Sequence, residues 1–473
     1  MTPPPLPQQE IMTKFMIERP EAALWADPGL GKTLATINAL KFLMSDGQVK
    51  GMTVVAPLRV TTLTWPGEIE KWGGLTYASL RTEEGIEAWH AGTADVYLIN
   101  YEMLATREVT RNGQTKVYPN FIAKCLKKKK FIPGDFLVWD EITKMKSPAN
   151  KAGKEFMPYR GLFKRHIGLT GTPQPNSCLD LFAQIKLLDG GRRLGTSFST
   201  FRSRYATSDY MGFKWEINPG SQEAIQEAIA DMTLVLRDTD YLDIPPVTFE
   251  DIDIVLPPAE LKAYKKFQRD MLATYEGKEV VALSAATLVQ KLSQYASGAT
   301  YYMGDEKRGV VPIHNHKIEA LAALHKRIGY RPLLVLTQFQ HEVDRILDSV
   351  PHAKAFDDRK LDDWNAGRIP MWVAHPKSMS HGLQMQGACC HVCWFTLGYS
   401  WEDYKQANAR VARTGQKNPT TIFRLLVADT VDWVQAEVIQ GKGEGESALK
   451  LALNYIKRLD VQPSSSIIPC FDG

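Results

Sequence analysis

The sequence lacks the features that mark a membrane, secreted or disulfide-stabilised protein. No apolar run approaches the ~20 residues that a membrane-spanning helix requires. The first residues have no basic start followed by an apolar core, so no signal peptide is expected. Cysteines number six, and the group at 389–393 has no second Cys or His pair at zinc spacing. We therefore expect a cytoplasmic protein with buried free thiols and no contact with membranes.

An excess of charge of one sign is missing as well. The 57 Lys and Arg residues stand against 53 Asp and Glu residues, which leaves a net charge of +4. This balance does not argue for nucleic acid by itself, although a cleft can carry a local positive field in a nearly neutral protein. The apolar fraction of 44% and the charged fraction of 23% exclude a disordered or collagen-like chain. A length of 473 residues predicts more than one domain.

What the sequence does contain is a repeated alternation of short apolar runs and helical stretches. Continuous apolar runs that are bounded by turns and separated by helices indicate a parallel sheet covered on both faces. Two series of such runs occur, at 22–26, 53–57, 96–99, 136–139 and 167–170, and then at 333–337, 371–374, 391–395 and 421–427. The predicted fold class is therefore α/β, with two lobes in tandem.

The stretch between the two series has a different character. It is aromatic and basic at 197–205, rich in turn residues at 240–246 and helical in pattern from 258 to 275. We predict lobe 1 at 1–176, helical insertions and a connector at 177–330, lobe 2 at 331–455 and a flexible tail at 456–473.

A glycine-rich turn joins the first apolar run to a helix predicted for 32–44. Backbone N–H groups in such a turn and at the helix N-terminus point at phosphate oxygens, and the helix dipole favours their charge. Lys32 then places a cation on the β and γ phosphates, and the Thr33 hydroxyl suits a magnesium ion. Ala26 stands where the strict pattern has glycine, and the alternative is an ordinary turn without a ligand. The predicted nucleotide contacts are Gly29, Leu30, Gly31, Lys32 and Thr33.

Two acidic residues and one glutamine suit the same site. Asp140 and Glu141 end the run at 136–139, and carboxylates at the carboxyl end of a parallel strand lie where α/β sheets bind ligands. Asp140 suits the magnesium ion, and Glu141 is placed to orient or deprotonate the attacking water. The alternative is an acidic helix cap. Gln9 offers a donor and an acceptor to an adenine edge, with a solvated terminal glutamine as the alternative.

Arg410 and Arg413 stand three residues apart in a segment predicted to be helical from 402 to 414. At that spacing both guanidinium groups project from one helix face. They can reach a γ-phosphate and neutralise the charge that develops during transfer, as arginine fingers do. The alternative is a solvated basic helix face.

With these residues in place, the chain resembles the superfamily 2 helicases and, within them, the Swi/Snf-like translocases. Motifs in the family's order lie at 26–33, 54–59, 100–102, 140–146, 169–173, 336–339, 378–386 and 406–416. Two positions depart from the family pattern. Ile142-Thr143 stands where many relatives have Ser or Ala followed by His, and Gln384-Met385 stands where Asn-Leu is usual. Without accessory domains, the chain is similar to compact phage and bacterial members.

The resemblance implies two RecA-like lobes, ATP and Mg²⁺ in the cleft between them, and nucleic acid running across both. It also implies that Gln9 reads adenine and that Gly382 belongs to the nucleotide site. The residues that it assigns to the nucleic-acid backbone, without reading of sequence, are Arg59, Thr170, Ser378 and Gln384. The predicted function is a nucleic-acid-stimulated ATPase that translocates on duplex DNA and remodels DNA or protein–DNA complexes.

Two alternatives stay open. The first is a strand-separating helicase acting on DNA or RNA, which would use the same nucleotide chemistry. The acidic box and the insertion at 177–330 favour the translocase over an RNA helicase. The second is a non-catalytic subunit that keeps the fold, against which the intact Lys32, Asp140 and Glu141 argue. The run of four lysines at 127–130 is interpreted as a solvated loop rather than a phosphate contact.

Overall fold

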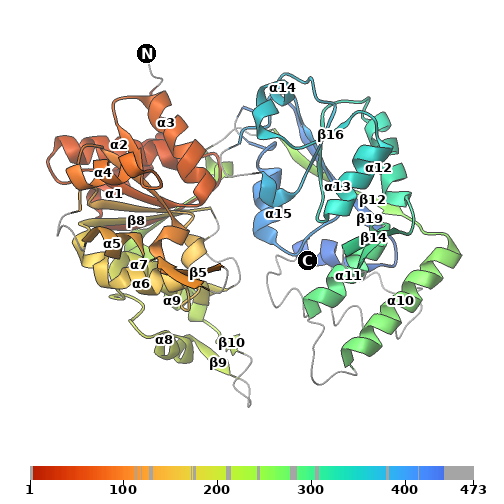
Figure 1. Cartoon of the computed structure of the whole chain (residues 1–473), viewed down its shortest axis with the longest axis horizontal. Helices are drawn as coiled ribbons and strands as arrows, with labels where there is room; N and C mark the ends of the chain where they lie inside the picture. Colours follow the sequence, from red (N-terminus) through yellow and green to blue (C-terminus); the bar gives the residue numbers. More distant parts are fainter. Residues whose placement is uncertain are drawn as a thin grey trace. The chain divides into compact units, whose positions relative to one another are not determined.

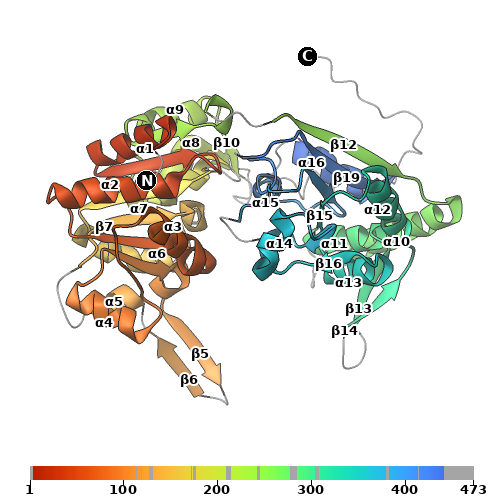
Figure 2. The same ribbon diagram turned by 90° about the horizontal axis from the view of Figure 1, so that it is seen from above.

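The computed structural model describes residues 4–440, except 112–113, 119, 127–131, 172, 174–176, 209–214, 242–244, 277–284, 304–307, 380–382 and 414. The chain forms two compact units, of which the first ends at residue 243 and the second begins at residue 244. Figures 1 and 2 show each unit as a sheet with helices around it. This architecture confirms the predicted α/β class with two lobes in tandem.

The first unit contains a parallel sheet in the order β11-β1-β8-β7-β2-β4-β3. Successive residues of a strand point to opposite faces, so β1 directs Leu24 into one hydrophobic core and Trp25 into the other. Helices α1 to α3 cover the face of Leu24, and α4 to α9 contribute to the core on the face of Trp25. The strands are β1 (Glu21–Ala26), β2 (Met52–Ala56), β3 (Tyr77–Ser79), β4 (Val96–Asn100), β7 (Phe136–Asp140), β8 (Arg165–Thr170) and β11 (Thr233–Leu236).

The helices of the first unit contribute apolar side chains to its two cores. They are α1 (Pro7–Glu18), α2 (Lys32–Ser45), α3 (Trp65–Trp72), α4 (Glu83–Ala91), α5 (Phe121–Leu126), α6 (Lys151–Phe156), α7 (Leu181–Asp189), α8 (Phe198–Tyr205) and α9 (Ser221–Ile229).

The second unit repeats this plan with a parallel sheet in the order β12-β19-β18-β15-β17-β16. Leu334 and Val335 of β15 again enter opposite cores. The strands are β12 (Val247–Ile254), β15 (Leu333–Leu336), β16 (Ala353–Ala355), β17 (Met371–Ala374), β18 (His391–Trp394) and β19 (Thr420–Val427). The helices are α10 (Pro258–Glu276), α11 (Ala285–Ala296), α12 (His316–Arg327), α13 (Gln340–Ser349), α14 (Leu361–Asn365), α15 (Trp401–Asn408) and α16 (Val431–Gln440).

Antiparallel two-stranded ribbons are added to both units. They pair β5 (Arg107–Arg111) with β6 (Gln114–Tyr118), β9 (Ala206–Ser208) with β10 (Trp215–Ile217) and β13 (Ala299–Met303) with β14 (Arg308–Pro312). Figure 2 shows β5 and β6 projecting from the body of the first unit. Across the described ranges, no helix is long and apolar enough to cross a membrane.

The segment 177–330 contains the helices α7 to α12 and, between them, one edge strand of each sheet. Its first part ends in β11, which joins the first sheet beside β1, and its second part begins with β12, which joins the second sheet beside β19. Both strands lie at sheet edges. Edge strands are only half covered, so β12 mixes exposed Thr and Asp with apolar residues and lacks the continuous apolar run of a buried strand.

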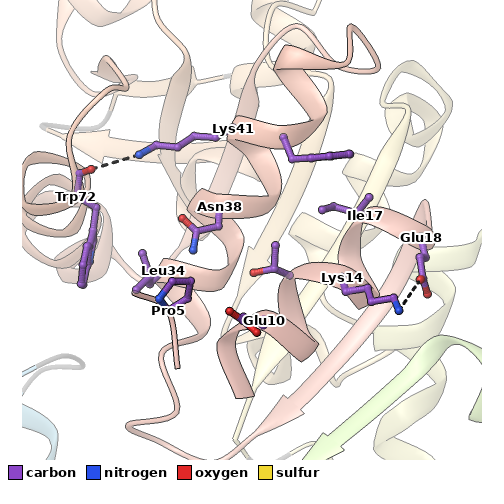
Figure 3. A pocket seen from close by; sticks show the side chains of 11 residues that line it. Pro5, Glu10, Lys14, Ile17, Glu18, Leu34, Asn38, Lys41 and Trp72 are labelled. Atoms are coloured by element: carbon purple, nitrogen blue, oxygen red, sulfur yellow. Dashed lines mark hydrogen bonds and ion pairs between the residues drawn. The ribbon is translucent and has the colours of Figure 1, made fainter. Parts of the chain in front are cut away.

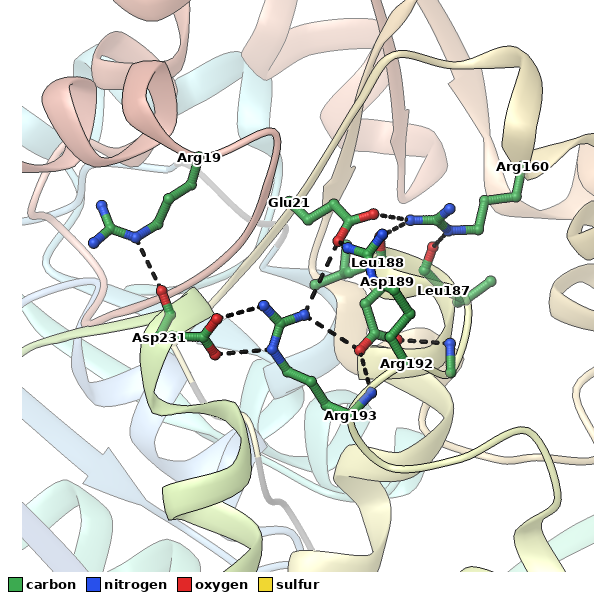
Figure 4. Close-up of polar contacts among 10 residues, drawn as sticks. Arg19, Glu21, Arg160, Leu187, Leu188, Asp189, Arg192, Arg193 and Asp231 are labelled. Carbon is green, nitrogen blue, oxygen red and sulfur yellow. Dashed lines mark hydrogen bonds and ion pairs between the residues drawn. The ribbon is translucent and has the colours of Figure 1, made fainter.

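Charged groups fix the amino end of β1. Glu21, the first residue of β1, accepts a hydrogen bond from Arg160 Nη2 at 2.5 Å and also pairs with Arg192 (Figure 4). Arg193 binds Asp231 through Nε and Nη2, at 2.8 and 2.6 Å. Because Arg160, Arg193 and Asp231 come from distant parts of the sequence, these pairs hold the β1–β8–β11 side of the sheet together.

A buried ion pair occupies the second unit. The Lys317 ammonium lies 2.7 Å from Asp432 Oδ2 and donates to the Phe395 carbonyl at 2.8 Å, with both charged side chains almost fully buried. Nearby, Glu342 accepts from the Thr396 hydroxyl at 2.7 Å. Burial raises the pKa of Glu342, and hydrogen bonds with Thr396 and the charge of Lys317 oppose that rise. Removing either partner of the buried ion pair would leave an uncompensated charge and destabilise the second unit.

The cysteines within the described residues are buried and free, which confirms the interpretation of structural thiols. Cys393 lies inside β18, and Cys389 precedes that strand. Burial raises the pKa of the Cys389 thiol to about 12. A thiol with such a pKa is protonated at neutral pH and therefore a poor nucleophile.

Candidate nucleotide site and nucleic-acid interface

The turn between β1 and α2 has the backbone of a phosphate-binding loop. Gly29 and Gly31 have φ values of 94° and 83°, which glycine adopts without a steric penalty. Leu30 is fully buried and anchors the turn in the hydrophobic core. α2 begins at Lys32, whose ammonium donates to the Ala26 carbonyl at 2.6 Å and lies 3.3 Å from the Asp27 carbonyl. The amino end of α2 and the cation of Lys32 thus lie at the same turn.

Gln9 lies directly against this loop. Its Oε1 atom accepts the Leu6 N–H at 2.9 Å, which caps the start of α1. A Cβ atom on Gly31 would lie 2.2 Å from Gln9 Nε2, so only glycine permits this approach. The structure therefore brings Gln9 beside Gly31, where the resemblance had placed a nucleotide contact.

A groove of about 630 Å³ runs beside the loop between α1 and α2 (Figure 3). Its lining includes Leu34, one residue after Thr33, and Trp72 at the end of α3. The Lys41 ammonium donates to the Trp72 carbonyl at 3.2 Å. Sequence reasoning missed this groove because it depends on how α1, α2 and α3 pack. Its lining comprises Pro5, Glu10, Thr13, Lys14, Ile17, Glu18, Leu34, Asn38, Lys41, Phe42 and Trp72.

Asp140 and Glu141 stand at the carboxyl edge of the same sheet. β7 ends at Asp140, and β8 separates it from β1 in the strand order. The Trp65 indole N–H donates to Asp140 Oδ2 at 2.9 Å. The Tyr101 hydroxyl lies 2.8 Å from the Asp140 carbonyl and 3.1 Å from that of Glu141. Two aromatic side chains therefore fix the position of the acidic pair.

The backbone at Glu141 is unusual. Its φ is 58°, in the left-handed region that residues other than glycine seldom adopt. Strained positions of this kind cluster at functional sites, where the surrounding structure holds them in place. Burial raises the pKa of Tyr101 well above its usual value, and the charges of Asp140 and Glu141 add to the rise. Tyr101 thus stays protonated and able to donate. The sequence analysis included Tyr101 only within the family motif at 100–102 and assigned it no role.

Thr170 lies with the acidic pair rather than at the surface. It ends β8 and is fully buried, and its hydroxyl lies 3.4 Å from Glu141 Oε2. The predicted contact between Thr170 and nucleic acid does not fit this burial. The structure instead joins Thr170 to the candidate nucleotide site.

The sequence predicted that Arg410 and Arg413 share one face of a helix. In the structure both residues lie beyond the end of that helix. α15 ends at Asn408, whose side chain accepts a hydrogen bond from the Trp394 indole at 3.0 Å. Arg410 follows in a turn and is 7% exposed, and its carbonyl accepts from Met385 N–H at 3.1 Å. Arg413 donates through Nη1 to the Leu383 carbonyl at 3.1 Å. Contacts with residues 383–385 therefore replace the continuation of the helix.

The other predicted nucleic-acid residues lie in the segments that follow strands. Arg59 is half-buried and follows β2, while Ser378 and Gln384 are exposed in the segment after β17. The Ser378 hydroxyl lies 2.7 Å from the His375 carbonyl, and the Gln384 carbonyl accepts from Asn365. Gly382 and the lysines at 127–130 lie outside the described residues.

A phosphate-binding loop and a fixed acidic pair at one edge of a parallel sheet, followed by a second such sheet, define a nucleotide-binding protein with tandem α/β lobes. A family model described as the SNF2-related domain matches residues 9–297. The chain belongs to the SNF2-related domain family and is an ATP hydrolase of that family.

Similar proteins come from phages, bacteria and animals. "Putative protein p41" of Acyrthosiphon pisum secondary endosymbiont phage 1 is 31% identical, over 96% of this chain and 99% of that protein. The "Putative ATP-dependent helicase/translocase YwqA" of Bacillus subtilis is 22% identical, over 93% of this chain. The "DNA annealing helicase and endonuclease ZRANB3" of Bos taurus is also 22% identical over 93% of this chain. The chain spans only 48% of YwqA and 40% of ZRANB3. A solved structure, "Sulfolobus solfataricus SWI2/SNF2 ATPase core in complex with dsDNA", matches with a TM-score of 0.44 and 19% identity over 97% of both chains.

Proposed function

We propose that this ATP hydrolase is stimulated by DNA, translocates along the duplex and remodels DNA or protein–DNA complexes. The observation that carries the proposal is the joint placement of the phosphate-binding loop and the fixed Asp140–Glu141 pair in a chain of the SNF2-related family. Names of related proteins support DNA as the polymer, since they include a DNA annealing helicase and DNA repair and recombination proteins.

The residues of the loop fit a triphosphate with its magnesium ion. Gly31 gives the turn a left-handed φ of 83°, and the start of α2 presents N–H groups beside the Lys32 ammonium. Thr33 and Asp140 supply the hard oxygen ligands that magnesium prefers. When bound there, the ion would neutralise charge on the phosphates.

The roles of the acidic pair follow from their contacts. The Trp65 indole N–H donates a hydrogen bond to one carboxylate oxygen of Asp140, and this bond fixes the orientation of the carboxylate. Glu141 orients or deprotonates the attacking water in the proposal, and Thr170 holds the Glu141 carboxylate. Because Thr170 lies within the motif at 169–173, a shift of that segment would change the position of Glu141.

Residues of both units are needed in this proposal. Arg410 and Arg413 neutralise charge that develops on the γ-phosphate, while Gln9 contacts the adenine. Arg59, Ser378 and Gln384 contact the nucleic-acid backbone, which suits movement along any sequence. Hydrolysis then changes which contacts the nucleotide makes, and the two units alternate between conformations with different affinity for it.

The test compares ATP turnover by the full chain without polymer and with duplex DNA, single-stranded DNA or RNA. The proposal expects stimulation by duplex DNA, and displacement of a third strand from a triplex without separation of the duplex strands. Strand separation would favour the helicase alternative. Stimulation by RNA alone, or no turnover with any polymer, would contradict the proposal.

A further inference from the structure

The hairpin formed by β5 and β6 carries basic side chains on one face and an acidic side chain on the other. In its register Arg107 lies opposite Tyr118, and Glu108 lies opposite Val117. Opposite residues share a face and successive residues alternate, so Arg107, Lys116 and Tyr118 lie on one face. Glu108 and Val117 lie on the other. All five side chains are exposed, and the Lys116 ammonium lies 5.3 Å from the centre of the Tyr118 ring.

One carboxylate fixes both ends of this hairpin. Glu155 Oε2, from α6, accepts hydrogen bonds from the N–H and the hydroxyl of Thr106, both at 2.8 Å. The same oxygen accepts from the Asn120 amide at 3.3 Å. Thr106 precedes β5 and Asn120 comes after β6. Although burial opposes it, these hydrogen bonds with Thr106 and Asn120 lower the pKa of Glu155, which keeps the carboxylate ionised at neutral pH.

The base of the hairpin also lies close to the candidate nucleotide site along the chain. β4 ends at Asn100 on the carboxyl edge of the sheet, and the turn that leads to β5 contains Tyr101. Tyr101 holds the carbonyls of Asp140 and Glu141. The hairpin therefore starts from the edge where α/β sheets bind ligands, and Figure 2 shows it extending away from the unit.

We infer that the face formed by Arg107, Lys116 and Tyr118 binds the phosphate backbone of duplex DNA and extends the DNA contact of the first unit. Arg and Lys provide contacts that do not depend on sequence, and a two-stranded ribbon has a size that a DNA groove admits. Glu108 on the opposite face repels phosphates, so charge selects which face meets the DNA. The inference rests on the proposed DNA-dependent function.

The test uses the full chain and duplex DNA of random sequence, with affinity measured over a range of salt concentrations. The double variant Arg107→Gln/Lys116→Gln removes two positive charges from the proposed face. It should bind at least tenfold more weakly, with the slope of log affinity against log salt reduced by about two, since each phosphate contact contributes about one. The matched control, Thr115→Glu/Val117→Glu, makes the same change in charge on the opposite face and should weaken binding much less.

Turnover without DNA should be the same in both double variants and in the unaltered chain, which shows that they are folded. A photo-crosslinking residue at position 116 should attach to the duplex, and one at position 115 should not. Equal loss of affinity in the two double variants, or an unchanged affinity and salt slope in the Arg107/Lys116 variant, would overturn the inference. Absence of duplex binding by the unaltered chain would instead contradict the proposed function.

Discussion

At the scale of single residues, the candidate site depends on groups that hold other groups in place. Glu141 adopts a left-handed backbone conformation, its carbonyl and that of Asp140 are bound by Tyr101, and its carboxylate contacts Thr170. A side chain positioned in this way loses little further entropy when it orients a water molecule. The acidic pair is therefore ordered by the protein itself.

Replacing Glu141 with glutamine tests this arrangement. Glutamine keeps an oxygen for the Thr170 hydroxyl but cannot take a proton from water, so Glu141→Gln should lower ATP turnover by roughly 100-fold or more. Nucleotide affinity should stay within threefold. Steady-state turnover and equilibrium nucleotide binding measure the two effects. Glu84→Gln, on α4, is the control for loss of an exposed carboxylate, and turnover of Glu141→Gln within tenfold of the unaltered chain would contradict the assigned role.

The residues that the sequence predicted and those that it did not differ in how far along the chain their contact partners lie. Gly29, Gly31 and Lys32 were predictable because the turn and the helix start are adjacent in sequence. Trp65 and Tyr101 were not, because their bonds to Asp140 and Glu141 join residues far apart in the chain. A polar side chain near a motif cannot be assigned to the site from the sequence, because its hydrogen-bond partner lies far away in the chain.

At the scale of elements, strands buried on both faces were predictable and edge strands were not. β1, β7 and β15 each contain a continuous run of buried apolar residues, whereas β11 and β12 lie at sheet edges with exposed residues. The end of α15 was also missed. Its termination at Asn408 depends on Trp394 and on contacts with residues 383–385, which no local helix signal reports.

β8 contributes a prediction about acid stability. His166 is 2% exposed, and burial together with the charge of Arg160 lowers its pKa to about 3. The unfolded chain takes up a proton on this imidazole near its ordinary pKa of 6.5, while the folded chain does not until about pH 3. Acidification therefore favours the unfolded state, and the stability that is fully present above pH 6.5 should fall by about 2 kcal/mol at about pH 5.

Thermal or denaturant unfolding at about pH 7.5 and about pH 5 measures this loss. In His166→Leu the difference between the two conditions should shrink, because the residue no longer titrates. His90→Gln, on α4, controls for removal of an imidazole elsewhere in the same unit. An undiminished difference between the two pH values in His166→Leu would exclude His166 as the cause.

At the scale of the whole molecule, the proposed chemistry needs both units. The phosphate-binding loop and the acidic pair belong to the first, and Arg410 and Arg413 belong to the second. Arg413→Ala should leave nucleotide binding within threefold and reduce turnover by about 1,000-fold, which is the low end of the effect of an arginine finger. Lys417→Ala, an exposed neighbour, is the control. Loss of nucleotide binding, or retained turnover, would contradict the assignment.

A short segment of the chain joins the two sheets. β11, on the edge of the first sheet, is followed by β12, on the edge of the second, with residues 237–246 between them. Even fully extended, such a linker spans at most about 36 Å. A tether of that length gives each half of the proposed site an effective concentration of the other in the millimolar range. Turnover per molecule should therefore be independent of protein concentration, and a mixture of Lys32→Ala and Arg413→Ala chains should regain little activity, because each intact half remains tied to a damaged one.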